Sequence, residues 1–450
     1  MMGWDVIIVG AGLAGAAAAR RLAEMGRQVL IVEQGVARTD PPGEHLRNLA
    51  PLRDNPDALF PAIDDCVDYL DVHAPPESLP GAFTTSFFGG MGVLWTNNCP
   101  RAVAGVDLPD LLSEEEWDRR YRTAEHALQV SDGQFEDSLR QRAVSNRLRA
   151  ALTTQGRSIV SLPLSGTRGE DDQVHFVGPS DVLAPVRDRF QLLEGRVEEI
   201  LLDAVKVVGV LVGGVIHRGR NVVVAAGAIE TPALLWRSGL RSRALGRYLS
   251  YHPVLIGQIV LDAELCAPGS DPDPVPRLGI PPTVQRPWFT MLLRDTNPLP
   301  VAPRDRDVSP NRLIEVQAFA PVDPNIDNVM TFGAGGSIGF DVPLRDDDED
   351  RRRSIESDAD ELSARLGRYR EGCRPQWAPL GTPHLMGSCR MGRVDDGSSV
   401  ADQHGEVWGT DGVYLATNGL IPNRLAVNPT LTTCAMAMRT TEAILANGTN

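Results

Sequence analysis

"WDVIIVGAGLAGAAAARRLAEMGRQVLIVEQG", residues 4–35, predicts a strand, a glycine-rich turn, a helix and a second strand. The β-branched run 5–9 is typical of a strand buried in a parallel sheet. Alanines dominate 13–25, which predicts a helix, and 28–32 has the apolar, β-branched composition of a second buried strand. The stretch therefore predicts the opening unit of a Rossmann-like α/β domain.

The turn between the first strand and the helix carries the pattern GxGxxG at Gly10, Gly12 and Gly15. Glycines at these positions let the backbone approach a pyrophosphate, whose negative charge faces the helix N-terminus. Glu33 ends the second strand, where a carboxylate can accept hydrogen bonds from both ribose hydroxyls. An acid there suits a free 2′-OH, so the stretch predicts FAD or NAD rather than NADP. Most of the 450 residues follow this fingerprint, which is typical of FAD proteins.

The composition is that of a globular protein, with 42% hydrophobic and 23% charged residues. The length suffices for two or three domains or for one large interleaved unit. The net charge of −15 argues against a nucleic-acid partner, because neutralising phosphates requires clustered Lys and Arg. An acidic balance is compatible with a cationic substrate, but it more often serves solubility.

Cysteine and targeting signals predict a reducing, soluble compartment. The six cysteines form no CxxC pair, so neither a disulfide framework nor a zinc site is indicated. No signal peptide precedes the first strand, and no apolar stretch reaches the roughly 18 residues of a membrane-spanning helix. We therefore expect a cytoplasmic protein, monomeric or a small homo-oligomer, without a metal or a membrane partner.

A second segment near the nucleotide is predicted at 195–239. Its first part alternates like a β-meander, and "NVVVAAGAIETPALLWRSG" (221–239) predicts a strand, a Gly-Ala turn and a helix. We expect cofactor contacts here at Val197, Ala226 and Gly227. From local features alone, an ordinary strand–helix turn explains the pattern nearly as well.

The middle of the chain predicts a substrate domain packed against the cofactor domain. Helices are expected within 106–150, and the dense prolines of 263–287 predict a loop. Two segments within 311–343 predict antiparallel strands, and 345–367 predicts a charged turn followed by an amphipathic helix.

These assignments predict two interleaved domains. The FAD-binding domain is expected to comprise 1–105, 185–255 and 378–450. The substrate-binding domain is expected to comprise 106–184 and 256–377.

"HLMGSCRMG", residues 384–392, places one titratable ring in a run of residues that suits neither a helix nor a regular strand. Further on, 412–446 predicts a strand, a loop and a long helix. Asn428 and Pro429 fit the N-cap and first position of that helix, whose N-terminus carries partial positive charge. Local features favour a capping role for the Asn428 side chain over a role in substrate binding.

These C-terminal stretches, HLMGSCRMG and NGLIPNRLAVNPTLT (418–432), resemble the signature of the glucose–methanol–choline (GMC) flavoprotein oxidoreductases. Within that superfamily the chain resembles the pyranose oxidase branch. FFGGMGVLWTNNCPR (87–101) is similar to its flavin-attachment loop, and SLPLSGTR (161–168) and PWFTMLLRD (287–295) match further segments in the same order. The resemblance spans nearly the whole chain, with gaps. It implies an α/β, overall α+β, fold: a Rossmann-like FAD-binding domain interleaved with a substrate domain of antiparallel sheet and helices.

The resemblance also implies functional residues. His384 matches the catalytic histidine of the family and Asn428 its partner asparagine, while Thr96 matches a threonine beside the flavin N5 edge. The further positions at which FAD contacts are expected are Gly10, Gly12, Gly15, Glu33, Gly90, Met91, Asn418, Pro429 and Thr430.

Two departures from the pyranose oxidase branch bear on these expectations. Leu94 stands where that branch has a histidine bound covalently to the flavin, so we expect non-covalent FAD. The region after 255 is too short for the branch's extra oligomerisation elements. The stretch after Arg294 matches the branch's substrate loop only loosely, which leaves the sugar specificity open.

The implied reaction is oxidation of a ring secondary alcohol of a sugar or glycoside, at C2 or C3, to a ketone. His384 would act as general base, because an unperturbed histidine pKa of about 6.5 lies near working pH. Asn428 would orient the hydroxyl, and oxygen would reoxidise the flavin to give hydrogen peroxide, unless a quinone is the acceptor.

Two alternatives remain open at this stage. The substrate could instead be an aminoglycoside, a nucleoside or another natural-product glycoside. In a different class, the chain could bind flavin without catalysis. His252 is interpreted as a structural residue. Trp95 is expected to pack against the ring system of the flavin or against the core rather than to take part in the chemistry.

Overall fold

The computed structural model describes residues 3–54, 64–70, 79, 81–170, 173–266, 276–293, 308–333, 336–378 and 383–447. The stretch after Arg294, for which we expected only a loose match to a substrate loop, lies outside the described residues, as does part of the proline-dense loop. No helix within the described ranges is long and apolar enough to cross a membrane.

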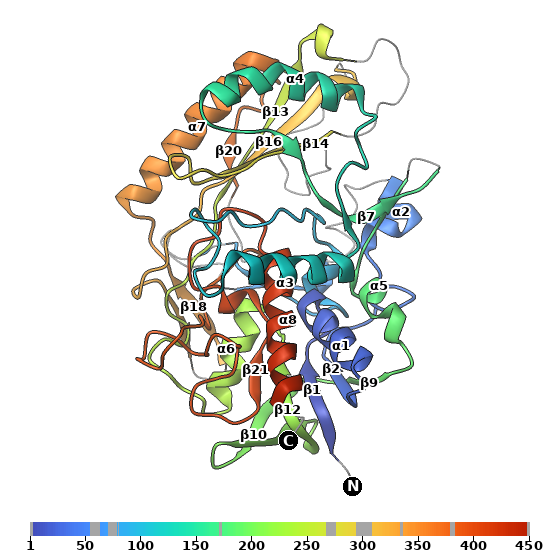
Figure 1. Ribbon diagram of the computed structural model, residues 1–450, viewed down its shortest axis with the longest axis vertical. Coiled ribbons are helices and arrows are strands. Elements are labelled where there is room, and N and C mark those ends of the chain that lie inside the picture. The colour runs from blue at the N-terminus through green and yellow to red at the C-terminus, as the bar shows by residue number, and fades with distance from the viewer. Residues whose placement is uncertain are drawn as a thin grey trace.

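A seven-stranded sheet organises the half of the molecule at the bottom of Figure 1, where both chain ends lie. Its order is β10-β11-β12-β1-β2-β9, and β21 pairs with β12. The strands are β1 (Trp4–Val9), β2 (Val29–Glu33), β9 (Phe190–Glu194), β10 (Val197–Asp203), β11 (Lys206–Val212), β12 (Val215–Val224) and β21 (Val413–Leu415). β1 is parallel to both β2 and β12 and most of it is buried, as its β-branched run predicts.

Helices cover this sheet. α1 (Leu13–Glu24) buries its alanines and packs against α8 (Thr430–Asn447), which in turn contacts α3 (Glu114–Ala127). Two further helices, α5 (Pro179–Leu183) and α6 (Gly227–Arg237), lie against α1 and β10 respectively. The strand–turn–helix–strand prediction for 4–35 is confirmed to within a residue at most boundaries.

A second seven-stranded sheet, entirely antiparallel, lies in the upper half of Figure 1. Its order is β19-β13-β16-β15-β14-β6, and β20 pairs with β13. The strands are β6 (Val160–Ser161), β13 (Val254–Leu261), β14 (Arg277–Ile280), β15 (Phe289–Leu293), β16 (Leu313–Phe319), β19 (Gly367–Tyr369) and β20 (Gln376–Trp377). α4 (Leu139–Thr154) and α7 (Asp346–Leu366) lie across its outer face.

Side chains alternate between the two faces of this second sheet, as strand geometry requires. Met291 and Phe319 belong to the hydrophobic core shared with the first sheet. Leu292 and Val316 belong to a separate core under α4 and α7. The inner face of the antiparallel sheet is therefore turned toward the half that contains the first sheet.

Smaller sheets complete the described structure. They are β3 (Val67–Tyr69) with β4 (Phe83–Thr85), β17 (Val329–Phe332) with β18 (Ile338–Asp341), and β5 (Val130–Ser131) with β7 (Leu164–Arg168) and β8 (Val174–Phe176). A short helix, α2 (Ala50–Asp54), and several single 3-10 turns lie in the connections.

The mixed α/β architecture is confirmed, with local corrections. The acidic run that we predicted to form a loop turn before the helix is instead part of α7. It occupies the first helical turn, where the partial positive charge of the helix N-terminus stabilises carboxylates. The strands predicted within 311–343 belong to two sheets, because β16 pairs with β13 and β15 while β17 pairs with β18. The domain boundaries stay a prediction.

Candidate active site

Three backbone segments meet at the glycine turn. Gly10 has φ +101°, and a Cβ there would lie 2.7 Å from the Ala225 carbonyl oxygen. A Cβ on Gly15 would lie 2.1 Å from the Gly10 carbonyl oxygen. At Gly12, by contrast, the nearest atom would be the Gly89 oxygen at 3.7 Å, an ordinary contact. Gly10 and Gly15 are therefore required by the packing of the turn itself, whereas Gly12 keeps space free in front of α1.

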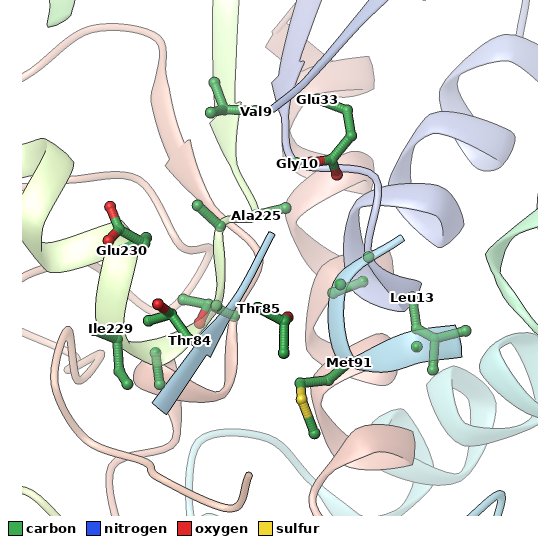
Figure 2. Close-up of a pocket in the computed structure, with 18 of the residues that line it drawn as sticks. Val9, Gly10, Leu13, Glu33, Thr84, Thr85, Met91, Ala225, Ile229 and Glu230 are labelled. Carbon is green, nitrogen blue, oxygen red and sulfur yellow. The ribbon is translucent and has the colours of Figure 1, made fainter. Parts of the chain in front are cut away.

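That space is part of a cavity between the carboxyl ends of the first sheet's strands and the start of α8. In Figure 2, Gly10 and Glu33 lie above and to the right of the cavity's centre and Glu230 to its left, while Thr85 and Met91 lie lower in the view. The predicted cofactor residues that line this cavity are Gly10, Gly12, Glu33, Gly90, Met91, Val197, Ala226, Gly227, Asn418 and Thr430. The position at strand ends is the one where open α/β sheets bind nucleotides.

The carboxylate of Glu33 is held at the cavity wall by two backbone donors. Its Oε2 accepts from Ala11 N at 2.8 Å and its Oε1 from Gly35 N at 2.7 Å. Burial raises the pKa of Glu33, while the backbone donors act in the opposite direction. Each oxygen retains a further lone pair, so the group can still accept from ribose hydroxyls. Together with the glycine turn and the N-terminus of α1, this wall fits the adenosine diphosphate part of FAD.

Other wall residues were not singled out by sequence reasoning. Thr84 and Thr85 of β4 line the cavity, as do Arg196 and Glu230, whose side-chain N–O separation is 3.5 Å. β4 follows a weakly patterned region that carries no motif, so no sequence signal pointed to it. Trp95, by contrast, was expected to pack against the ring system or the core, and it lines the cavity and donates from Nε1 to the Val177 carbonyl at 3.0 Å.

Five predicted site residues do not line this cavity. Gly15 lies beneath the turn, against Gly10 and Ala225. The Thr96 hydroxyl accepts a hydrogen bond from Asn98 Nδ2 at 3.2 Å. The others are His384, Asn428 and Pro429, and Pro383 next to His384 does belong to the wall. The roles of all five stay predictions.

The stretch 384–392 contains a turn at 388–389 and is held between two other segments by backbone hydrogen bonds. Met386 exchanges backbone hydrogen bonds with Ser250 at 2.8 and 3.1 Å, and Cys389 N donates to the Gly419 carbonyl at 3.0 Å. The pairing of Met386 with Ser250 brings Nδ1 of His384 into hydrogen-bond contact with Nε2 of His252. Interpreting His252 as merely structural therefore missed a residue that touches the candidate base.

His384 is partly accessible, yet loss of solvation lowers its pKa to about 4. A ring with that pKa is neutral at pH 7 and keeps a lone pair for a proton. The electrostatics of the site are therefore compatible with the predicted base.

Asn428 does not cap α8. The helix begins at Thr430, and the buried Oδ1 of Asn428 has no hydrogen-bond partner among the described residues. The capping interpretation from local sequence is therefore wrong. A buried, unpaired amide oxygen is costly, so its presence points to a missing partner such as a ligand hydroxyl.

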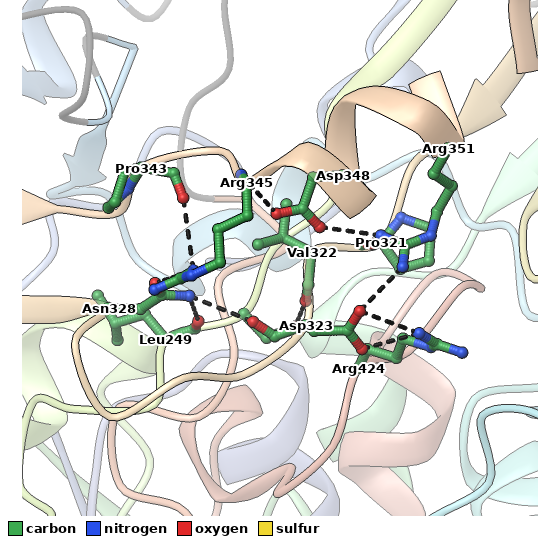
Figure 3. A network of polar contacts seen from close by, with 11 residues as sticks. Leu249, Pro321, Val322, Asp323, Asn328, Pro343, Arg345, Asp348, Arg351 and Arg424 are labelled. Atoms are coloured by element: carbon green, nitrogen blue, oxygen red, sulfur yellow. Dashed lines mark hydrogen bonds and ion pairs between the residues drawn. The ribbon is translucent and has the colours of Figure 1, made fainter. Parts of the chain in front are cut away.

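The loop that carries Asn428 is anchored from two sides. Arg424 Nη1 bonds both carboxylate oxygens of Asp323, at 2.8 and 3.0 Å, and Arg351 of α7 also bonds Asp323, at 2.9 Å (Figure 3). On the other side, Asp107 Oδ2 accepts from Ala426 N at 2.8 Å. These carboxylates fix the loop to the second sheet's helix and to the region before α3, which limits the positions open to Asn428.

The buried ring of His45 holds the 87–101 loop through a hydrogen bond to its backbone. Its Nδ1 accepts from Arg47 N at 3.1 Å, so its Nε2 carries the proton and donates to the Trp95 carbonyl at 2.9 Å. Burial, with Arg47 as a smaller cause, lowers the pKa of His45 to about 3. The ring is therefore held as one neutral tautomer beneath the loop.

The pKa of His45 predicts an acid-sensitive fold. In the unfolded chain its pKa is about 6.5, so between that pH and about 3 only the unfolded state binds the proton. The contribution of His45 to the free energy of unfolding, fully present above pH 6.5, should therefore decrease by about 1.4 kcal/mol for each pH unit below that value. Thermal unfolding midpoints of wild type and His45→Gln, measured from pH 7 to pH 5, should show a weaker pH dependence in the variant. Equal slopes would mean that His45 is not buried neutral.

Comparisons with family models, with known proteins and with solved structures identify flavin-dependent oxidoreductases as the proteins that this chain is similar to. Models described as GMC oxidoreductase match 185–254 and 342–437, and a model described as FAD dependent oxidoreductase matches 5–70. The chain is 30% identical to a C-glycoside 3-oxidase of Microbacterium trichothecenolyticum, over 97% of this chain and 95% of that protein. It is 28% identical to a pyranose 2-oxidase of Tricholoma matsutake, over 86% and 78% respectively. A solved pyridoxine 4-oxidase from Mesorbium loti has a TM-score of 0.65 at 17% identity, over 98% of this chain and 99% of that one, a likeness of fold alone.

Proposed function

Because the chain belongs to the GMC oxidoreductase family, we propose that it oxidises a ring secondary alcohol of a sugar or glycoside, at C2 or C3, to a ketone. It is an FAD-dependent alcohol oxidoreductase. The observation that carries the proposed substrate class is the match, over 97% of the chain, to a C-glycoside 3-oxidase.

Two side chains are proposed to handle the substrate hydroxyl. His384 accepts the hydroxyl proton as general base, which its lowered pKa of about 4 allows at neutral pH. Asn428 binds the same oxygen through its amide, and its unpaired Oδ1 supports a role toward a ligand. When bound, FAD would accept the carbinol hydride and pass two electrons to oxygen, which with two protons gives hydrogen peroxide.

The cofactor is proposed to lie along the cavity described above. Gly12 and the N-terminus of α1 would face its pyrophosphate and Glu33 its ribose, while the start of α8 at Thr430 would face the flavin end. The partial positive charge of α8 would favour negative charge gathering on the flavin during reduction.

Non-covalent attachment is a further part of the proposal. Leu94 is buried against Phe87 and Val93, and its side chain offers no nucleophile for a bond to the flavin. Acid precipitation of the purified protein should therefore leave essentially all of the yellow cofactor in the supernatant, where its absorbance can be measured. Flavin that stays with the washed pellet would contradict this expectation and point to another attachment residue.

An anaerobic screen tests the proposed function. Purified yellow protein is mixed without oxygen with free pyranoses, C- and O-glycosides, aminoglycosides and simple alcohols, and the bleaching of the yellow flavin absorbance is followed. We expect bleaching by at least one pyranose or glycoside, and peroxide on admission of air. Bleaching by simple alcohols alone would overturn the sugar assignment. Fast reoxidation by a quinone with slow reoxidation by air would identify a dehydrogenase instead of an oxidase.

A further inference from the structure

His252 and His384 face one another because of strand register. Ser250 and Met386 form an antiparallel bridge with both backbone hydrogen bonds made. In antiparallel pairing, moving two residues forward on one segment and two back on the other reaches the next pair on the same face. That pair is His252 and His384, so the backbone pairing itself places the two rings side by side.

The contact permits only one proton between the two rings. Nε2 of His252 meets Nδ1 of His384, with ring centroids 4.4 Å apart and ring planes at 64°. Phe319 of β16 stacks on His252 at 4.4 Å, which holds that ring in its plane. One of the two nitrogens must therefore donate and the other accept. The choice decides whether the other nitrogen of His384, Nε2, presents a lone pair or an N–H group to a substrate.

The role proposed for His384 decides the direction of this bond. Nδ1 of His384 is the nitrogen that contacts His252, so Nε2 is the nitrogen left to face a substrate. A base must present a lone pair there, so the single proton of the neutral ring belongs on Nδ1, which donates to Nε2 of His252. Nδ1 of His252 is buried and has no hydrogen-bond partner among the described residues.

We propose that His252 is a positioning residue that holds His384 as the tautomer protonated on Nδ1, which leaves Nε2 of His384 free to accept the substrate hydroxyl proton. This rests on the proposed function, in which His384 is the base. The proton balance is simple: the substrate O–H bond breaks, an N–H bond forms at Nε2 of His384, and the proton on Nδ1 stays in place.

His252 is suited to remain neutral while this happens. It is 1% exposed, and burial, followed by the neighbouring His384, lowers its pKa well below the usual value. When His384 becomes an imidazolium, its Nδ1–H bond to the neutral Nε2 of His252 becomes charge-assisted and stronger. The pair therefore stabilises the protonated base more than the neutral one, which favours proton transfer.

The tautomer can be measured directly on the wild-type holoenzyme. With ¹⁵N-labelled histidine, protonated and unprotonated ring nitrogens have well-separated chemical shifts, and His384→Gln identifies the His384 signals by their loss. We expect Nδ1 of His384 to carry the proton and Nε2 to carry none at pH 7.5. A proton on Nε2 would overturn the proposal, whether or not any substrate has been found.

A matched pair of variants tests the consequence for the reaction. His252→Gln retains an acceptor oxygen near the position of Nε2, whereas His252→Met has similar volume and no comparable acceptor. We expect His252→Met to lower the anaerobic flavin-reduction rate at saturating substrate about 10- to 100-fold, as for other groups that orient a histidine. KM and FAD content should change little, and His252→Gln should recover most of the rate. Equal losses in both variants, or no loss in either, would contradict a positioning role.

The two levels of proposal fail in different ways. If wild type is bleached by no sugar or glycoside, the proposed function fails, but the nitrogen shifts still report the tautomer. If wild type is bleached and His384→Ala is not, while His252→Met matches wild type, only the role of His252 is refuted.

Discussion

Replacing His384 with alanine should lower the rate constant of flavin reduction by substrate about 10²- to 10⁴-fold, the usual contribution of a general base. Without the ring, the hydroxyl proton must leave to water or remain through hydride departure, which raises the barrier. The lowered pKa of about 4 also means that the wild-type ring is neutral above that pH. The wild-type rate should therefore be flat between roughly pH 6 and pH 8 and fall only in more acidic solution.

Rapid mixing of oxygen-free enzyme and substrate measures this rate without interference from reoxidation. His126→Ala is a suitable control, since His126 is exposed on α3, and it should behave as wild type. The visible spectrum of His384→Ala should show a normal flavin content, because His384 does not line the nucleotide cavity. Wild-type reduction rates in His384→Ala would remove the base from the mechanism.

The second large effect is expected at the glycine turn, where two neighbouring substitutions should fail differently. Gly12→Ala places a methyl group in the space before α1, with 3.7 Å to the nearest protein atom. The fold should therefore survive while the approach of a pyrophosphate is blocked. We expect FAD affinity to fall at least about 100-fold, or about 2.7 kcal/mol.

Gly15→Ala, in contrast, requires the Gly10 carbonyl to move, since the new Cβ would lie 2.1 Å from its oxygen. That variant should lose soluble, folded protein rather than FAD affinity alone. Gly26→Ala is the control: its φ of +77° adds strain, but nothing lies within 4 Å and no cofactor contact is expected. Circular dichroism and FAD titration of the three variants separate folding from binding. Normal FAD affinity in Gly12→Ala would show that the turn does not hold the pyrophosphate.

Elements with local causes were predictable from the sequence. The strand, turn and helix at 4–35 follow from hydrophobic period and glycine spacing, and the structure places them as predicted. The strand and helix around Ala226 were likewise visible, and the structure brings that turn against Gly10. Each of these signals is contained within about 30 residues of chain.

Features that depend on distant pairing were not predictable in the same way. The contact of His252 with His384 follows from the register of Ser250 with Met386, which no local pattern encodes. Local capping rules favoured a cap at Asn428, whereas the resemblance implied a role beside His384. The cap is not formed, and anchors at Arg424 and Ala426 hold the loop that carries Asn428. Here tertiary contacts outweigh the local preference for a cap.

The contact between Ala225 and the glycine turn also means that the turn cannot be packed until a much later part of the chain has been synthesised. Ala225 N donates to the Val9 carbonyl at 2.8 Å, and its own oxygen closes over Gly10. At about 5–20 residues per second, the ribosome reaches Ala225 roughly 10 to 40 s after it has finished the turn. Throughout that interval the nascent chain carries the whole fingerprint motif without the segment that packs it. A fragment ending before Ala225 would contain the motif and leave the wall of the predicted nucleotide cavity incomplete.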